Sequence, residues 1–402
     1  MTRDAFDIWR KRRSASGQRQ LADTIRTLVY RTDEALFDRL DLSSDAQFLH
    51  PVLFAYFTDP SPPISLAQAL YGLTPAMRRP SSIRIQTDAA GCACLGLVGT
   101  VETDAPSAKL HFGRTNGGSP YGCTSEEAPL PFRLRSPLLV PGTAIEVTTD
   151  VHPLFRRLYG DPGAQSVNTA AAQRPQGHLL HLMVALGLIR AHCASVWDEI
   201  AAFTRLIVLY SASAPNSFAA LSAHGAIFCN VREGEDEVAL LEDVAHQAAH
   251  VIFNAFSHDP RTLLAVNPET AIQDMSPGSG ETRSFYVVLH ALFTYTLICR
   301  VLAGVHNANV LPERQAHEVL GRLGFTLVRF AADLALLDMP AVYTDAGRRC
   351  YSAFSAEFER IKTRHGALVA DFGYGNQPYV FDYLRFVEAN GWAWPVACSA
   401  VS

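Results

Sequence analysis

Residues 225–256 of the chain read GAIFCNVREGEDEVALLEDVAHQAAHVIFNAF. The first seven residues, GAIFCNV, form a short apolar run that is typical of a buried strand. A charged turn follows from Arg232 to Asp236, and a helix is predicted from about residue 236 to 257. No helix breaker interrupts the stretch from Glu242 to His250. The pattern therefore predicts a strand followed by a helix that carries His246 and His250 four residues apart.

The rest of the chain predicts a mainly helical fold. Residues 1 to about 80 are predicted to be helical, with apolar residues near the 3.6 period between 20 and 40. From 81 to 150 the stretches SIRIQT, LHFGR and AIEVTT alternate like strands between turns. Further helices are predicted at 178–203, 281–303, 313–337 and from the capping residue Thr344 to about 365, and RLIVLYS (205–211) is predicted to be a buried strand.

This pattern predicts an α+β fold that is predominantly helical, with a small antiparallel sheet. We expect two closely packed domains. Residues 1–175 would contain the N-terminal helices and a β-rich segment. Residues 176–402 would form a helical domain around the histidine pair. A chain of 402 residues is long enough for more than one hydrophobic core.

Composition narrows the classes of function. The chain is 48% hydrophobic and 18% charged with a net charge of −5, which is ordinary for a globular protein. It lacks the basic surplus typical of proteins that bind nucleic acid or anionic membranes, and neither partner is expected. The one basic cluster, Arg10 to Arg13, is interpreted as a solvated helix end.

Localisation is predicted to be cytoplasmic. The N-terminal segment MTRDAFDIWRKRR lacks the apolar region of a secretory signal. Eight cysteines are scattered without paired spacing, as expected for small buried side chains in a reducing compartment. The apolar stretch from Phe285 to Val305 contains His290 and Arg300, so we interpret it as a buried helix and not as a membrane span.

His246 and His250 are the strongest candidates for metal ligands. Residues i and i+4 share one face of a helix, so both imidazoles can converge on one ion. This is the geometry of the HExxH motif, in which two histidines bind zinc and the intervening glutamate is the general base. Here Gln247 occupies that position, and an amide cannot accept a proton from metal-bound water. Asp243, one turn earlier, is a candidate to orient a histidine ring.

A second apolar helix supplies two more candidates. His290 lies in the segment FYVVLHALF (285–293), which is too apolar to be exposed. Arg283 precedes it by two helical turns, roughly 10 Å along the axis. A guanidinium at that distance from a metal ligand could hold the far carboxylate of a chelating dicarboxylate.

In these segments the chain resembles the HExxH-motif proteins of peptide natural-product clusters, which are similar to 2-oxoglutarate-dependent peptide β-hydroxylases. Four features match in order over about residues 205–360: SFAALSAHGAIFCNV (217–231), the His-x-x-x-His helix (246–250), Arg283 before Leu289-His290, and TDAGRR (344–349). The chain departs from the family pattern at Gln247 and Ala291. It also lacks the proline- and tryptophan-rich approach to the arginine.

The resemblance implies that His246, His250 and His290 bind Fe(II) and that Arg283 anchors 2-oxoglutarate. It implies an oxygenase that hydroxylates an unactivated carbon of a peptide or amino-acid-like natural-product intermediate. Such an enzyme activates dioxygen at the metal and needs no protein base in place of Gln247. Non-haem iron usually takes two histidines and one carboxylate, so Glu281, Asp274 and Glu269 remain alternatives to His290.

Two other functions remain open. Three histidines are a familiar zinc set, which would suit a zinc-dependent hydrolase or lyase with Glu242 or Asp243 as its base. The altered motif would also suit a non-catalytic member that only binds peptides. The sequence does not indicate an oligomeric state.

Overall fold

The computed structural model describes residues 3–114, 121–125, 128–159, 177–213 and 216–391. Contacts between Cα atoms divide the chain into two units. The N-terminal unit comprises residues 2–187 and 197–259, and the C-terminal unit comprises residues 188–196 and 260–402 together with residue 1. The histidine-pair helix therefore belongs with the N-terminal half of the chain. The predicted division at residues 175 and 176 falls outside the described residues.

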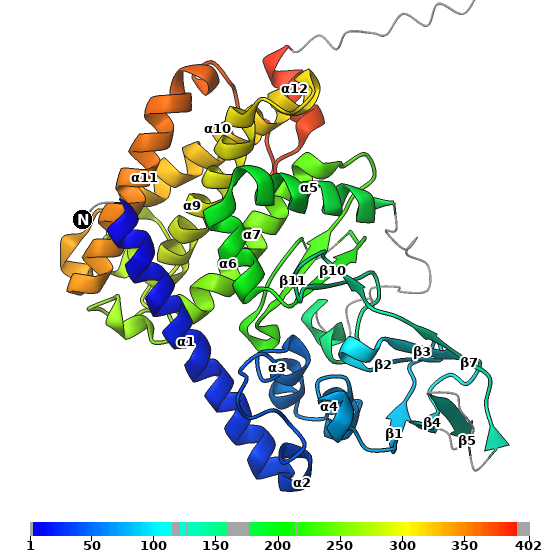
Figure 1. Cartoon of the computed structure of the whole chain (residues 1–402). Coiled ribbons are helices and arrows are strands. Elements are labelled where there is room, and N and C mark those ends of the chain that lie inside the picture. The colour runs from blue at the N-terminus through cyan, green and yellow to red at the C-terminus, as the bar shows by residue number, and fades with distance from the viewer. Residues whose placement is uncertain (1–2, 115–120, 126–127, 160–176, 214–215, 392–402) are drawn as a thin grey trace, which may run out of the picture. The chain divides into compact units, whose positions relative to one another are not determined.

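The predicted α+β, mainly helical fold is confirmed (Figure 1). The N-terminal unit contains α1 (Arg3–Thr32), α2 (Glu34–Phe37), α3 (Pro51–Thr58), α4 (Leu66–Tyr71), α7 (Glu237–Phe256) and most of α5 (His178–His192) and α6 (Ala194–Phe203). The predicted single helix at 178–203 is wrong, because it is interrupted at Cys193. Short 3-10 helices lie at Ala76–Arg78 (η1), Gly96–Val98 (η2), Pro153–Tyr159 (η3) and Leu221–Ala223 (η4).

The described residues of the N-terminal unit form three small sheets. The first pairs β1 (Ser82–Gln86), β4 (Lys109–Gly113), β5 (Gly122–Ser125) and β6 (Ala128–Pro129), and the second pairs β2 (Cys92–Cys94), β3 (Thr100–Thr103) and β7 (Phe132–Arg135). Both are antiparallel, as predicted.

The third sheet has the order β11-β10-β9-β8 and is mixed. It contains β8 (Leu138–Leu139), β9 (Glu146–Thr148), β10 (Leu206–Tyr210) and β11 (Ala226–Asn230). The strands β9, β10 and β11 are parallel, and only β8 runs antiparallel. Parallel neighbours need a long crossover, and α5 and α6 lie in the chain between β9 and β10. The sequence did not predict this parallel pairing.

Helix α1 packs against the C-terminal end of α7 (Figure 1). The Trp9 and Phe256 rings meet edge to face with centroids 5.5 Å apart, and Arg13 Nε donates to the Phe256 carbonyl at 2.8 Å. Gly17 allows the two backbones to touch, because a Cβ at this position would lie 1.8 Å from the Ala255 carbonyl oxygen. These contacts fix the position of α7 within its unit.

The interpretation of the basic cluster Arg10 to Arg13 as a solvated helix end is wrong for Arg10, which lies inside α1. The Arg10 side chain is buried and donates to both carboxylate oxygens of Glu199, at 2.5 and 2.6 Å. An unpaired guanidinium would be costly at such a site, and the bidentate pair satisfies it.

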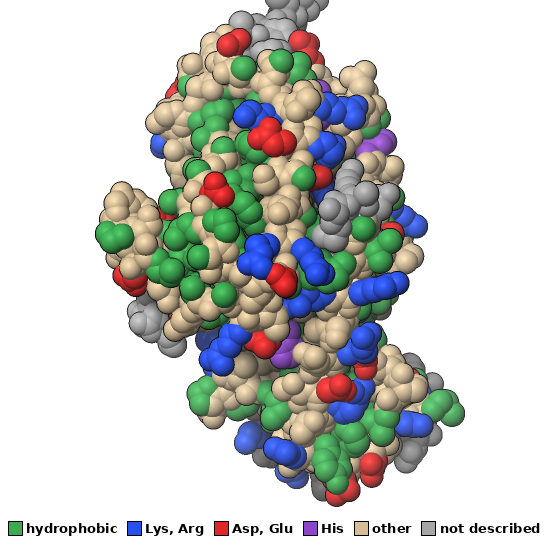
Figure 2. All heavy atoms as spheres, turned by 90° about the vertical axis from the view of Figure 1, so that its left-hand side faces the viewer, with side chains coloured by type: hydrophobic (Ala, Val, Ile, Leu, Met, Phe, Trp, Pro, Cys, Tyr) green, Lys and Arg blue, Asp and Glu red, His purple; other side chains and the backbone are tan. Residues whose placement is uncertain are grey.

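On the face shown in Figure 2, basic and acidic side chains are interspersed among apolar ones.

The C-terminal unit is built on α9 (Phe285–Ala308), α10 (Glu313–Leu336) and α11 (Asp345–Val369), which contact one another. It also contains α8 (Ile272–Met275), α12 (Tyr383–Asn390) and the 3-10 helices η5 (Pro260–Thr262), η6 (Pro277–Ser279) and η7 (Pro340–Val342). Thr344 caps α11 as predicted, since its Oγ1 accepts from the Gly347 amide at 3.1 Å.

Among the described helices, α9 is long and apolar enough to cross a membrane. Of the 18 residues in its most apolar stretch, 72% are buried. It also contains Arg300, whose side chain is 5% exposed and pairs with Glu357 at 2.9 Å. Burial and an internal ion pair are features of a core helix, in line with the sequence interpretation.

Candidate metal centre

Helix α7 brings His246 and His250 together. Asp236 caps the helix by accepting from the Val238 amide at 2.9 Å, and the helix continues without interruption to Phe256. The two imidazole rings lie with centroids 4.9 Å apart and planes tilted by 31°. Both rings are partly buried, whereas Ala245 beside them is fully buried. The i, i+4 spacing thus places the two rings next to each other on α7.

The environment keeps His250 in the form that binds metal. Burial, together with the neighbouring His246, lowers the pKa of His250 to about 3. A metal binds neutral imidazole, so no proton has to leave His250 at neutral pH before an ion can bind.

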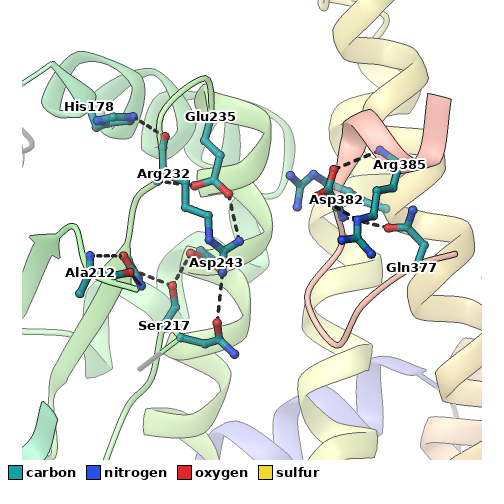
Figure 3. Close-up of polar contacts among 12 residues, drawn as sticks. His178, Ala212, Ser217, Arg232, Glu235, Asp243, Gln377, Asp382 and Arg385 are labelled. Atoms are coloured by element: carbon teal, nitrogen blue, oxygen red, sulfur yellow. Dashed lines mark hydrogen bonds and ion pairs between the residues drawn. The ribbon is translucent and has the colours of Figure 1, made fainter. Parts of the chain in front are cut away.

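A series of hydrogen bonds connects Asp243 on α7 to Ser217, Asn230 and Ala212 (Figure 3). Ser217 Oγ donates to Asp243 Oδ2 at 2.5 Å and accepts from the Asn230 amide at 2.9 Å. The Asn230 side chain in turn accepts from the Ala212 amide and donates to its carbonyl, at 3.0 and 2.8 Å. These hydrogen bonds link the end of β11 and the segment after β10 to α7. Ser217 was part of a sequence motif, but its partner was not predicted.

Gln247 lies at the position of the HExxH glutamate. Its side chain is only 2% exposed, and its Oε1 has no hydrogen-bond partner among the described residues. The partly exposed rings of His246 and His250 are thus more accessible than the amide between them. Gln247 fills the interior of the N-terminal unit and is not placed to act on a solvent-facing ligand.

Arg283 is not on the helix that was predicted to carry it. Ser284 caps α9 by accepting from the Val287 amide at 3.3 Å, so α9 begins at Phe285. Arg283 precedes this cap outside any helix, and its carbonyl accepts from the Ile272 amide at 3.0 Å. The argument that placed Arg283 and His290 on one helical face, two turns apart, is therefore wrong.

The Arg283 guanidinium is engaged by two carboxylates of its own unit. Nη1 and Nη2 donate to the two oxygens of Asp333 at 3.1 and 2.7 Å, and Nη2 also donates to Glu281 at 2.8 Å. These hydrogen bonds raise the pKa of Arg283, and the bond from Arg283 lowers the pKa of Glu281. Asp333 lies 50 residues further along the chain on α10, and no local pattern pointed to it.

His290 lies on α9 as predicted and is partly buried. Its ring lies 5.9 Å from that of Tyr286, edge to face. It belongs to the C-terminal unit, as do the alternative ligands Glu269, Asp274 and Glu281. Within the ranges that the structure describes, no three His, Cys, Asp or Glu side chains gather as a metal site. The third ligand therefore stays a prediction of the sequence.

The chain matches no model of a known protein family and no curated protein.

Proposed function

We propose that the protein is a metal-dependent enzyme, and specifically a non-haem Fe(II)/2-oxoglutarate oxygenase that hydroxylates an unactivated carbon of a peptide or amino-acid-like substrate. The observation that supports it best is the proximity of the partly buried His246 and His250 rings on α7. Two imidazoles with rings 4.9 Å apart suit two adjacent coordination positions on one ion.

In this proposal His246 and His250 supply two ligands, and His290 or a carboxylate supplies the third. With Fe(II) bound, dioxygen would be the oxidant for C–H hydroxylation, and 2-oxoglutarate would be oxidised to succinate and CO2. The Ser217–Asp243 hydrogen bond would keep the segment after β10 beside the ligands. The neutral Gln247 is compatible with oxidation, which needs no protein base at that position.

Binding of 2-oxoglutarate at Arg283 would involve competition. The two carboxylates that contact the guanidinium already exceed its single positive charge. A third carboxylate would have to displace Glu281 or Asp333. Glu281 is the weaker competitor, because the Asp333 side chain is only 5% exposed and binds Arg283 through both oxygens. We therefore propose that 2-oxoglutarate, when it binds here, displaces Glu281.

Single-turnover oxidation tests the proposal. The full chain is loaded anaerobically with Fe(II) and 2-oxoglutarate, a candidate peptide is added, and oxygen is then admitted. We expect succinate release that His246→Ala and His250→Ala abolish and that His111→Ala, an exposed histidine on β4, leaves unchanged. Absence of succinate across plausible substrates would overturn the oxygenase. Function that persists in His246→Ala would indicate a non-catalytic, peptide-binding protein.

A zinc-dependent hydrolase or lyase is the second candidate, and the position of Asp243 favours it. This carboxylate lies one helical turn before His246 and is oriented by Ser217. A positioned carboxylate near a metal-bound water is the usual general base of such enzymes. Stoichiometric zinc after metal-replete purification, with no absorption change on adding Fe(II) and 2-oxoglutarate, would support this candidate over the oxygenase.

A further inference from the structure

A second candidate site lies in the β-rich part of the N-terminal unit, away from the histidine pair in the chain. A cavity of about 220 Å³ opens where β3 begins and β7 ends, beside β8, β9 and α5. This is several times the roughly 30 Å³ that one water occupies in the liquid. Its polar lining includes Thr100, Arg135, Ser136, Glu146 and Thr148.

Glu146 is the unusual residue of this cavity. It lies on β9 between the neighbouring strands β8 and β10, and its backbone amide donates to the Arg205 carbonyl at 2.9 Å. Its carboxyl group has no hydrogen bond or ion pair with any described residue. Burial raises the pKa of Glu146 to about 7, and the Arg135 guanidinium opposes this rise only in part.

Arg135 does not neutralise Glu146, because the Arg135 guanidinium already forms ion pairs with two other carboxylates. Its Nε donates to Glu102 at 2.8 Å and its Nη2 donates to Asp150. The thiol of nearby Cys94 stays protonated, because burial raises its pKa to about 12. With Glu146 ionised, the four charged groups comprise one cation and three anions. The local field therefore favours a cation in the cavity.

We propose that this cavity binds an organic cation, namely a primary ammonium or guanidinium group on a short aliphatic stem, with the Glu146 carboxylate as its counter-ion. The hydroxyl groups of Thr100 and Thr148 line the same space and can accept further hydrogen bonds. Pro137, Leu138 and Leu179 offer apolar contact for the stem. The proposal is independent of the metal centre and of the reaction proposed there.

Calorimetric titration of the full chain at pH 8 tests it with three probes: n-butylamine, agmatine and N-acetyl-Gly-Lys-Gly-amide. Binding of the free amines would indicate a small-molecule ligand, whereas tighter binding of the tripeptide would indicate a lysine side chain. Either result supports the site. We expect Glu146→Gln to weaken binding about tenfold or more, as loss of a partly buried charged hydrogen bond does. Glu233→Gln, at an exposed position of the same unit, should change nothing.

A proton balance provides the second measurement. Binding at pH 6 must ionise Glu146, so heats measured in buffers of different ionisation enthalpy should show release of up to one proton per ligand. That release should vanish in Glu146→Gln. If Glu146→Gln does not fold, the wild type still decides the question through its proton release. Failure of all three probes to bind at about 10 mM, equal binding of n-butanol, or binding without proton release would each overturn the proposal.

Discussion

Helix α7 and the segment before α9 carry candidate residues of the same predicted site, yet their geometry has different origins. On α7 the i, i+4 spacing along one helix brings the centroids of the two histidine rings to 4.9 Å. Before α9, the position of Arg283 depends on Asp333 from another helix and on Glu281. Local periodicity therefore brings two candidate ligands together, whereas the role of a charged residue depends on which opposite charges the fold brings to it.

The largest expected effect is on metal binding at α7. His246→Ala and His250→Ala should each lower the affinity for Co²⁺ or Zn²⁺ more than about 100-fold, because losing even an outer-shell partner costs 10–100-fold. Metal analysis and calorimetry measure this. His111→Ala is the matched control, and Arg283→Ala should also retain the metal. An unchanged affinity in both α7 variants would show that the converging rings are not a metal site.

The next effect concerns the stability of the Arg283 region. Arg283→Ala leaves the buried Asp333 carboxylate without its bidentate partner, and we expect a loss of about 2 kcal/mol in the free energy of unfolding. This is below the range for fully buried pairs, because the Arg283 side chain is 37% exposed. Urea unfolding measures it.

A double-mutant cycle sharpens this result. Arg283→Ala with Asp333→Ala should lose less than the sum of the two single variants, since no uncompensated charge remains. If Arg283→Ala instead keeps its stability but loses 2-oxoglutarate binding, Arg283 is a cofactor anchor. Its position would then not depend on Asp333, and the difference between this segment and α7 would disappear.

The same contrast explains what the sequence could and could not predict. The helix of the histidine pair was predicted within a residue or two of α7, and the cap at Thr344 was predicted to the residue. Both depend on neighbours along the chain. The Arg10–Glu199 pair, the Arg283–Asp333 pair and the parallel β9–β10–β11 pairing join distant residues, for which one sequence carries no signal. The exact start of α9 was missed because Ser284, and not the periodicity, sets it.

Buried histidines predict acid sensitivity in the N-terminal unit. His224 is fully buried against the Phe54 ring, with neither ring nitrogen hydrogen-bonded to a described residue, and burial lowers its pKa to about 3. In the unfolded chain the His224 ring takes up a proton near pH 6.5, whereas in the folded protein it does so only near pH 3. The contribution of the neutral ring to stability is therefore complete above pH 6.5 and is lost as the pH falls towards 3. Between pH 7 and 5 the loss from one such group is about 2 kcal/mol.

His224→Phe should reduce the loss of stability between pH 7 and 5 by about that amount, because phenylalanine preserves the packing and takes no proton. Chemical unfolding at the two pH values measures the difference. His111→Phe at an exposed position should leave the pH dependence unchanged. An equal pH dependence in wild type and His224→Phe would mean that the ring is protonated or hydrated in the folded protein.

The smallest effect tests whether α7 arranges its pair without help from its cap. Asp236→Ala removes the acceptor for the Val238 amide and should lower stability by about 1 kcal/mol, whereas Asp236→Asn should lose less. Metal affinity should change little, since the pair lies almost three turns inside the helix. Thermal unfolding and metal titration on the same samples measure both quantities. A large loss of affinity would show that the ligand geometry depends on the helix start.

The contact at Gly17 gives the N-terminal helix an unexpected influence. No side chain larger than hydrogen fits between α1 and the Ala255 carbonyl, so any substitution at Gly17 must push α7 away from its neighbour. Ala255 lies little more than one turn beyond His250. Random mutagenesis for altered metal preference would therefore be expected to return changes at position 17, far from the candidate ligands in sequence. Tags or deletions that loosen the first helix would be expected to change metal binding at the proposed site.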